Sequence, residues 1–160
     1  PTIERATASI LEALPEFEGA GISIALENHE SYRSSELVHL VEGIHSRYLG
    51  ICLDTVNSFG ALEGPEHTIT ELAPYTLILH VKDFDVVRVG NQMGFAIVGR
   101  LAGEGRLDIE WLFDRVLKEG KGPDAILELW TPFLDDVGNT IQEEDEWASR
   151  SVRYLRGKVR

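Results

Sequence analysis

Four short runs of apolar residues divide the chain, and each of them ends at a side chain that can bind a metal ion or carry a proton. Short apolar runs bounded by polar residues are typical of buried β-strands. The runs are 22–26, 51–53, 77–79 and 125–127, and the residues that follow them are Glu27, Asp54, His80 and Glu128. The pattern therefore predicts four strands whose C-terminal ends all carry residues of the metal-ligand type.

Segments with helical periodicity separate these runs. Apolar residues at positions 3, 6, 10, 11 and 14 predict a first helix that stops before Pro15. Four more helices are predicted from caps and breakers. They begin at Ser34 or Ser35, cover 69–73 up to Pro74, follow the N-cap Asp108, and open with the capping-box pair Thr140 and Glu143.

Strands that alternate with helices predict a parallel sheet with right-handed crossovers. In such α/β proteins the active site lies at the C-terminal edge of the sheet, so we treat the four strand-end residues as one constellation. Residues 84–107 are predicted to form a long loop with several glycines that covers this site.

Length and composition restrict the class of protein. The 160 residues predict a single domain, and they are too few for a closed eight-unit barrel, which needs about 250. A formal net charge of −12 argues against nucleic acid and anionic membranes as partners. Cys52 is the sole cysteine, which excludes a disulfide within the chain and favours a reducing, cytoplasmic location.

The order Glu, Asp, His, Glu at the four strand ends resembles the xylose-isomerase-like TIM-barrel superfamily, in particular its sugar phosphate isomerases and epimerases. The motifs that carry the resemblance are Leu26-Glu27-Asn28-His29, Leu53-Asp54-Thr55, His80-Val81-Lys82-Asp83, Gly103-Glu104-Gly105-Arg106-Leu107-Asp108 and Leu127-Glu128. The resemblance implies an α/β fold of the (β/α) TIM-barrel type. Its four parallel βα units correspond to strands 5–8 of a (β/α)8 barrel.

Residues 1–160 then form a single domain that is the C-terminal half of a longer barrel. We expect residues upstream of Pro1, because the only methionine is Met93 and Pro1 is no natural start. Four parallel units alone would leave open sheet edges. A second possibility, in which two copies of the chain complete one barrel as a homo-oligomer, stays open.

The resemblance also implies a single divalent cation held by Glu27, Asp54, His80 and Glu128. Three carboxylates and one imidazole make an oxygen-rich site that suits Mn²⁺ best, with Mg²⁺, Co²⁺ and Zn²⁺ as alternatives. Such an ion stabilises an enediolate of the substrate. In enzymes of this kind the two glutamates, Glu27 and Glu128, move the proton, and the sequence leaves open which is the acid and which the base.

Each ligand also has a structural alternative. The glutamates can be ordinary loop-edge carboxylates, Asp54 can form an Asx turn, and a histidine on an apolar run can be a core residue. Five further residues are predicted to bind substrate, with solvated loop residues or surface ion pairs as the alternative. They are His29, Asn57, Lys82, Asp83 and Arg88, of which Asn57 stands where many relatives have a histidine.

The leading hypothesis is a metal-dependent isomerase or epimerase acting on a small sugar or sugar phosphate. A lyase or dehydratase on the same scaffold is the second hypothesis, and a non-catalytic sugar-binding barrel is the third. The first two require a bound divalent ion, whereas the third does not.

Overall fold

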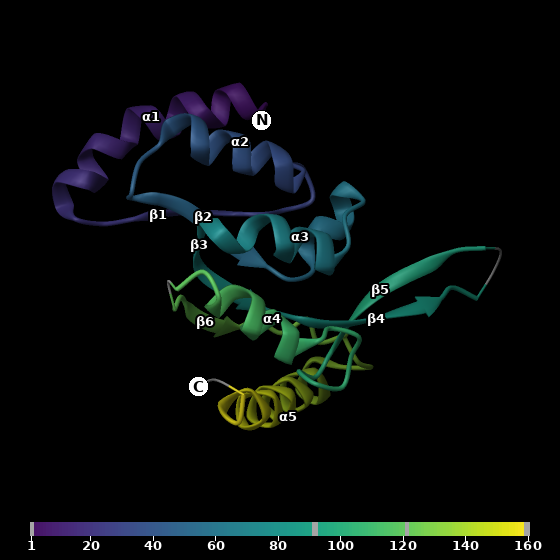
Figure 1. Ribbon diagram of the computed structural model, residues 1–160. Helices are drawn as coiled ribbons and strands as arrows, with labels where there is room; N and C mark the ends of the chain where they lie inside the picture. Colours follow the sequence, from purple (N-terminus) through teal and green to yellow (C-terminus); the bar gives the residue numbers. More distant parts are fainter. Residues whose placement is uncertain (1, 91–92, 121, 159–160) are drawn as a thin grey trace. The chain divides into compact units, whose positions relative to one another are not determined.

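The computed structural model describes residues 2–90, 93–120 and 122–158 (Figure 1). Helices and strands alternate along most of the chain, as the sequence predicts. In chain order the elements are α1 (Ile3–Ala20), β1 (Ile24–Glu27), α2 (Ser34–Ile44), β2 (Leu49–Asp54), the 3₁₀ helix η1 (Asn57–Ala61), α3 (Pro65–Leu72), the 3₁₀ helix η2 (Ala73–Tyr75), β3 (Thr76–Val81), β4 (Asp83–Arg88), β5 (Phe95–Arg100), α4 (Ile109–Leu117), β6 (Asp124–Leu127) and α5 (Val137–Arg156).

Four strands form a parallel sheet in the order β1-β2-β3-β6, which confirms the predicted fold class. β1 and β2 pair from Ile24 opposite Leu49 to Glu27 opposite Cys52. The backbone N–H of Glu128, just past β6, donates to the carbonyl of Val81 at the end of β3 over 3.1 Å. The C-terminal ends of both strand pairs therefore carry the residues singled out in the sequence.

The chain divides into two compact units. The first contains the chain up to Leu79 together with 115–125, and the second contains 80–114 and the chain from Ile126 onward. In the first unit α2 and α3 pack against β2, and α1 packs against α2 (Figure 1). Every residue of β2 is buried, and its Ile51 and Leu53 are fully so, as are Ile69 and Leu72 of α3.

The prediction that the first helix stops before Pro15 is wrong, because α1 continues to Ala20 with the proline inside it. A proline removes a single backbone N–H, so a helix with several turns on each side can continue through it. The helix ends instead at Gly21, whose φ of 70° lies in the left-handed region. The Gly21 N–H donates to the carbonyls of Glu18 and Phe17, which is the usual helix C-terminus.

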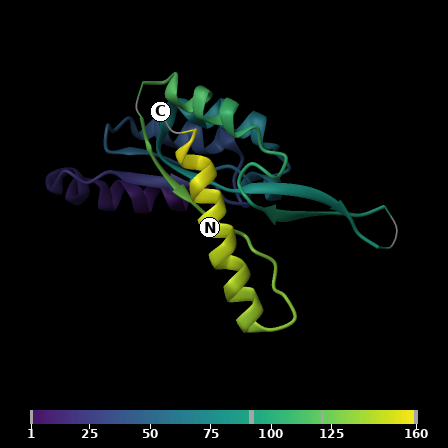
Figure 2. The same ribbon diagram turned by 90° about the horizontal axis from the view of Figure 1, so that it is seen from below.

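The start of α5 is also predicted wrongly, because the N-cap lies four residues before the predicted Thr140. Asp136 is the N-cap, and its Oδ1 accepts a hydrogen bond of 3.0 Å from the N–H of Asn139. The hydroxyl of Thr140 donates to the Asp136 carbonyl and accepts from the N–H of Leu134. These bonds fasten the segment before α5 alongside the first turns of the helix (Figure 2). Aspartate and threonine are both favourable N-cap residues, and because Asp136 precedes Thr140 the helix is about one turn longer than predicted.

Other predicted helix starts are confirmed. α2 begins at Ser34, although its N-cap is Arg33 and not a serine. At the start of α4 the N–H of Trp111 donates to Oδ1 of the predicted cap Asp108 over 2.9 Å. α3 begins earlier than expected, at Pro65, where a proline at the first helical position has no intrahelical partner to lose. None of the helices in the described ranges has both the length and the apolar character needed to cross a bilayer.

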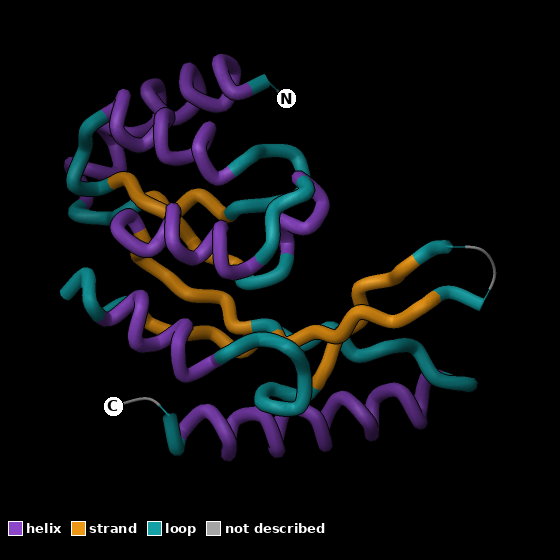
Figure 3. Tube along the Cα trace, turned by 45° about the vertical axis from the view of Figure 1, so that its right-hand side comes forward, coloured by secondary structure: helices purple, strands orange, loops and turns teal. Residues whose placement is uncertain are grey.

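The prediction of a long loop over 84–107 is wrong for the residues that form strands β4 and β5. Strands β4 and β5 pair antiparallel from Asp83 opposite Arg100 to Arg88 opposite Phe95 (Figure 3). The two strands are rich in valine, isoleucine and phenylalanine, which favour extended backbone and outweigh the glycines that suggested a loop. Among the described residues, 89–90, 93–94 and 101–108 lie outside the strands, and 101–108 form the loop that follows β5.

Asp83 anchors that loop. Its carboxylate accepts four backbone hydrogen bonds of 2.8 to 3.1 Å, from the N–H groups of Phe84, Gly103, Gly105 and Leu107. A Cβ at position 105 would lie 2.1 Å from Oδ1 of Asp83, so only glycine allows the loop to close this tightly around the carboxylate. Asp83 is buried, with 4% of its surface exposed.

We predict that Asp83→Asn lowers the free energy of unfolding by about 2–4 kcal/mol, because the amide nitrogen would face backbone donors and leave them unsatisfied in a buried place. Urea denaturation measures this change. Asp85→Asn is the matched control, since Asp85 lies on the same strand but contacts the exposed Arg106, and it should change the stability much less. Equal losses for the two variants would show that Asp83 does not anchor the loop.

Candidate metal centre

Two carboxylates of the first compact unit lie at the ends of neighbouring strands. Glu27 is the last residue of β1 and Asp54 is the last residue of β2. Because the strands are parallel and paired, both side chains belong to the same edge of the sheet. Glu27 is exposed, whereas Asp54 is fully buried.

Asp54 is fixed by the turn that follows it. Its Oδ1 accepts hydrogen bonds of 2.8 Å from the N–H groups of Val56 and Asn57. This is the Asx turn that the sequence offered as an alternative to a ligand role, and it uses one of the two carboxylate oxygens. The turn and a ligand role for the other oxygen are therefore compatible.

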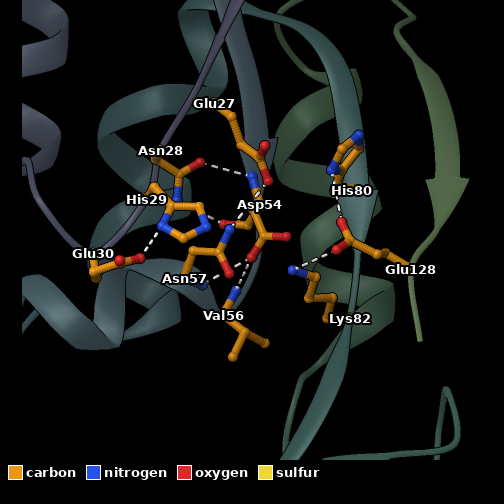
Figure 4. A network of polar contacts seen from close by, with 10 residues as sticks. All are labelled: Glu27, Asn28, His29, Glu30, Asp54, Val56, Asn57, His80, Lys82 and Glu128. Atoms are coloured by element: carbon orange, nitrogen blue, oxygen red, sulfur yellow. Dashed lines mark hydrogen bonds and ion pairs between the residues drawn. The ribbon is translucent and has the colours of Figure 1, made fainter. Parts of the chain in front are cut away.

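Asn57 connects the two carboxylates. Its backbone N–H donates to Asp54, and its side-chain Nδ2 donates to Oε1 of Glu27 over 3.1 Å (Figure 4). An amide donor orients a carboxylate without adding charge. The structure thus brings three of the residues selected from the sequence into one hydrogen-bonded network within this unit.

Asn28 belongs to the same network, although the sequence analysis did not select it as a site residue. It is fully buried. Its side chain forms hydrogen bonds with the backbone N–H and carbonyl of Asp54 and with the hydroxyl of Ser58. The signal was a polar amide directly after a strand-end ligand. That signal is weak in a sequence, because asparagine there is also typical of a solvated turn.

The second compact unit holds the other two strand-end residues. Nδ1 of His80 lies 2.8 Å from Oε2 of Glu128, and Nζ of Lys82 lies 2.8 Å from Oε1 of the same carboxylate (Figure 4). His80 and Lys82 are two positions apart, so along an extended chain their side chains point to the same side. The Lys82 side chain is only 11% exposed, so this ion pair is largely shielded from water.

The remaining predicted substrate-binding residues lie elsewhere in their units. His29 is exposed and forms an ion pair with Glu30. Arg88 is exposed at the end of β4, opposite Phe95 in the hairpin. Asp83 is buried, and the loop from Gly103 to Leu107 takes up its carboxylate.

Each unit thus supplies two side chains of the metal-ligand type, Glu27 and Asp54 in the first and His80 and Glu128 in the second. Three carboxylates and one imidazole offer mainly hard oxygen donors and no thiolate. This donor set fits a divalent cation such as Mn²⁺, Mg²⁺, Co²⁺ or Zn²⁺.

A related protein at substantial identity is the 3-oxo-isoapionate decarboxylase of Pectobacterium atrosepticum. The two are 36% identical over 155 residues, which cover 97% of this chain and 56% of that protein. The chain thus spans little more than half of the relative's length.

Solved structures show the same fold. A xylose isomerase-like TIM barrel protein from Mycobacterium smegmatis, in complex with magnesium, superposes with a TM-score of 0.67 at 15% identity, covering 96% of this chain and 51% of that one. The D-psicose 3-epimerase of Clostridium cellulolyticum H10 superposes with a TM-score of 0.71 at 19% identity, covering 98% and 56%. The family's sequence profile, described as xylose isomerase-like TIM barrel, matches residues 1–158. This chain, with its four parallel strands, therefore belongs to the xylose isomerase-like TIM barrel family.

Proposed function

We propose that this protein takes part in metal-dependent chemistry on a small sugar-derived substrate, and that Glu27, Asp54, His80 and Glu128 bind the metal ion together. The observation that carries the proposal is the placement of all four at or beside the C-terminal ends of parallel strands. That is the edge at which α/β barrels hold their active sites. Mn²⁺ is our first choice of ion, because carboxylate oxygens dominate the donor set.

A divalent ion bound there would act as a Lewis acid that polarises a substrate carbonyl and stabilises the negative charge of an enediolate. The chain's own residues orient the carboxylates for this task. Asn57 donates to one oxygen of Glu27, and Lys82 donates to one oxygen of Glu128. Each glutamate thereby has one oxygen oriented by a donor, and the second oxygen of Glu128 lies 2.8 Å from Nδ1 of His80, another proposed ligand.

The reaction we favour is decarboxylation of a 3-oxo sugar acid, which is a form of the lyase hypothesis. The 36% identity to a decarboxylase supports it, whereas the epimerase structures share only the fold at below 20% identity. In this step the bond between the carboxylate carbon and its neighbour breaks, and the electron pair moves toward the 3-oxo carbonyl. A proton is then returned to carbon, and we assign that transfer to Glu27 or Glu128.

Isomerisation or epimerisation is the second candidate. Two carboxylates from different strands, Glu27 and Glu128, are the side chains such a reaction needs, one to remove a proton from carbon and the other to return it. His29, Asn57, Lys82 and Arg88 stay predicted contacts for the hydroxyl or anionic groups of the substrate in either reaction. We omit Asp83 from this set because its carboxylate serves the loop.

We predict that Mn²⁺ raises the melting temperature of the metal-free protein. At an ion concentration of about 100 times the dissociation constant, binding adds about 2.7 kcal/mol to the folded state, which corresponds to about 5–10 °C for a chain of this size. Differential scanning fluorimetry after treatment with a chelator measures this shift. Asp54→Asn should abolish it, whereas Asp114→Asn, which changes an exposed carboxylate of α4, should leave it intact.

If none of Mn²⁺, Mg²⁺, Co²⁺ and Zn²⁺ changes the melting temperature, the metal site is refuted, and a non-catalytic sugar-binding barrel becomes the better description.

We predict that the Mn²⁺-loaded protein releases CO₂ from a 3-oxo sugar acid. Glu128→Gln should reduce kcat by about 10²–10⁴-fold, the usual contribution of a general acid or base. Glu12→Gln, which changes an exposed glutamate of α1, should have no effect. Deuterium incorporation into a ketose in D₂O, without any CO₂ release, would instead establish the isomerase or epimerase reaction.

A further inference from the structure

Asn28 is the one fully buried amide beside the candidate metal ligands in the described part of the chain, with none of its surface exposed. Its Nδ2 donates to the backbone carbonyl of Asp54 and to Oγ of Ser58, each over 2.9 Å. Its Oδ1 accepts a hydrogen bond of 2.7 Å from the backbone N–H of Asp54. All three bonds lie within the first compact unit.

These contacts extend the strand pairing beyond its last backbone register. The pairing of β1 with β2 ends at Glu27 opposite Cys52, and Asp54 lies two residues further along β2. The Asn28 amide offers Asp54 one acceptor and one donor, as a neighbouring peptide group would. The Asn28 side chain therefore binds both the N–H and the carbonyl of Asp54 beyond the last residue pair of β1 with β2.

Fixing this backbone also fixes the carboxylate. Once the Asp54 main chain is set, the N–H groups of Val56 and Asn57 hold its Oδ1 from the turn. The same Asn57 reaches Oε1 of Glu27 with its side chain, as Figure 4 shows. One chain of contacts thus runs from Asn28 through Asp54 and Asn57 to Glu27.

We propose that Asn28 is a positioning residue for the metal centre, which sets the orientation of Asp54 directly and that of Glu27 through Asn57. The inference rests on the proposed function, since it concerns the same metal ion. Only asparagine fits the place: aspartate lacks the N–H donor, and glutamine is one methylene longer in a fully buried site. Groups that orient metal ligands in this way commonly contribute about 10–100-fold to metal affinity.

The test compares Asn28→Asp with Leu40→Ala, a core variant on α2 that destabilises the same unit without touching the network. Mn²⁺ affinity is measured by calorimetric titration at a temperature where both variants are folded. The visible absorption of the Co²⁺-loaded proteins gives the coordination geometry. We expect Asn28→Asp to bind Mn²⁺ about 10–100-fold more weakly and to alter the Co²⁺ spectrum. Leu40→Ala should match the wild type in both measurements despite its lower melting temperature.

Ser58→Ala covers the case in which Asn28→Asp does not fold. It removes only the hydroxyl that receives an N–H of Asn28, and we expect it to weaken Mn²⁺ binding about threefold, a fraction of the loss expected at Asn28 itself. Wild-type affinity and an unchanged Co²⁺ spectrum in the folded variants would overturn the inference while leaving the proposed function intact. A wild-type protein that binds neither ion would overturn both.

Discussion

The parallel pairing of β1 with β2 is the constraint on which the candidate site depends. Paired parallel strands finish at the same edge of a sheet, so Glu27 and Asp54, which are far apart in sequence, become neighbours that Asn57 connects. Beyond the last backbone register the side chain of Asn28 continues the pairing. The strand order therefore brings the two carboxylates together, and the buried amide of Asn28 fixes the backbone that carries Asp54.

A common rule describes the three carboxylates. Each has an oxygen held by a donor from the chain: a side-chain amide for Glu27, two backbone N–H groups for Asp54 and an ammonium group for Glu128, whose other oxygen lies against His80. Restricting one oxygen reduces the rotamers that a carboxylate can adopt, which lowers the entropy that binding would otherwise cost. In the proposed site Glu27 and Asp54 would turn their second oxygen to the cation, and the cation would replace the contact between Glu128 and His80. A cation would also offset the negative charge that three carboxylates concentrate in a chain with a net charge of −12.

Sequence patterns predicted the sheet well and the local boundaries less well. Apolar runs that end at polar residues located all four parallel strands, although only β2 is buried along its whole length and β6 is largely exposed. Pro15 was misleading, since its cost to a helix depends on the turns around it. The β4–β5 hairpin was missed because its glycines outweighed its valines in the interpretation. The role of Asp83 and the contacts of Asn28 could not be predicted, because each joins segments more than fifteen residues apart that only the fold brings together.

The central claim is that Glu27, Asp54, His80 and Glu128 bind one divalent ion. A crystal structure of the protein grown with Mn²⁺, with anomalous data that identify the metal, tests it most directly. The account predicts a single Mn²⁺ with one atom from each of the four side chains within about 2.0–2.6 Å, the usual range for oxygen and nitrogen ligands. An ion bound elsewhere, or any two of the four side chains directed away from a common centre, would contradict it.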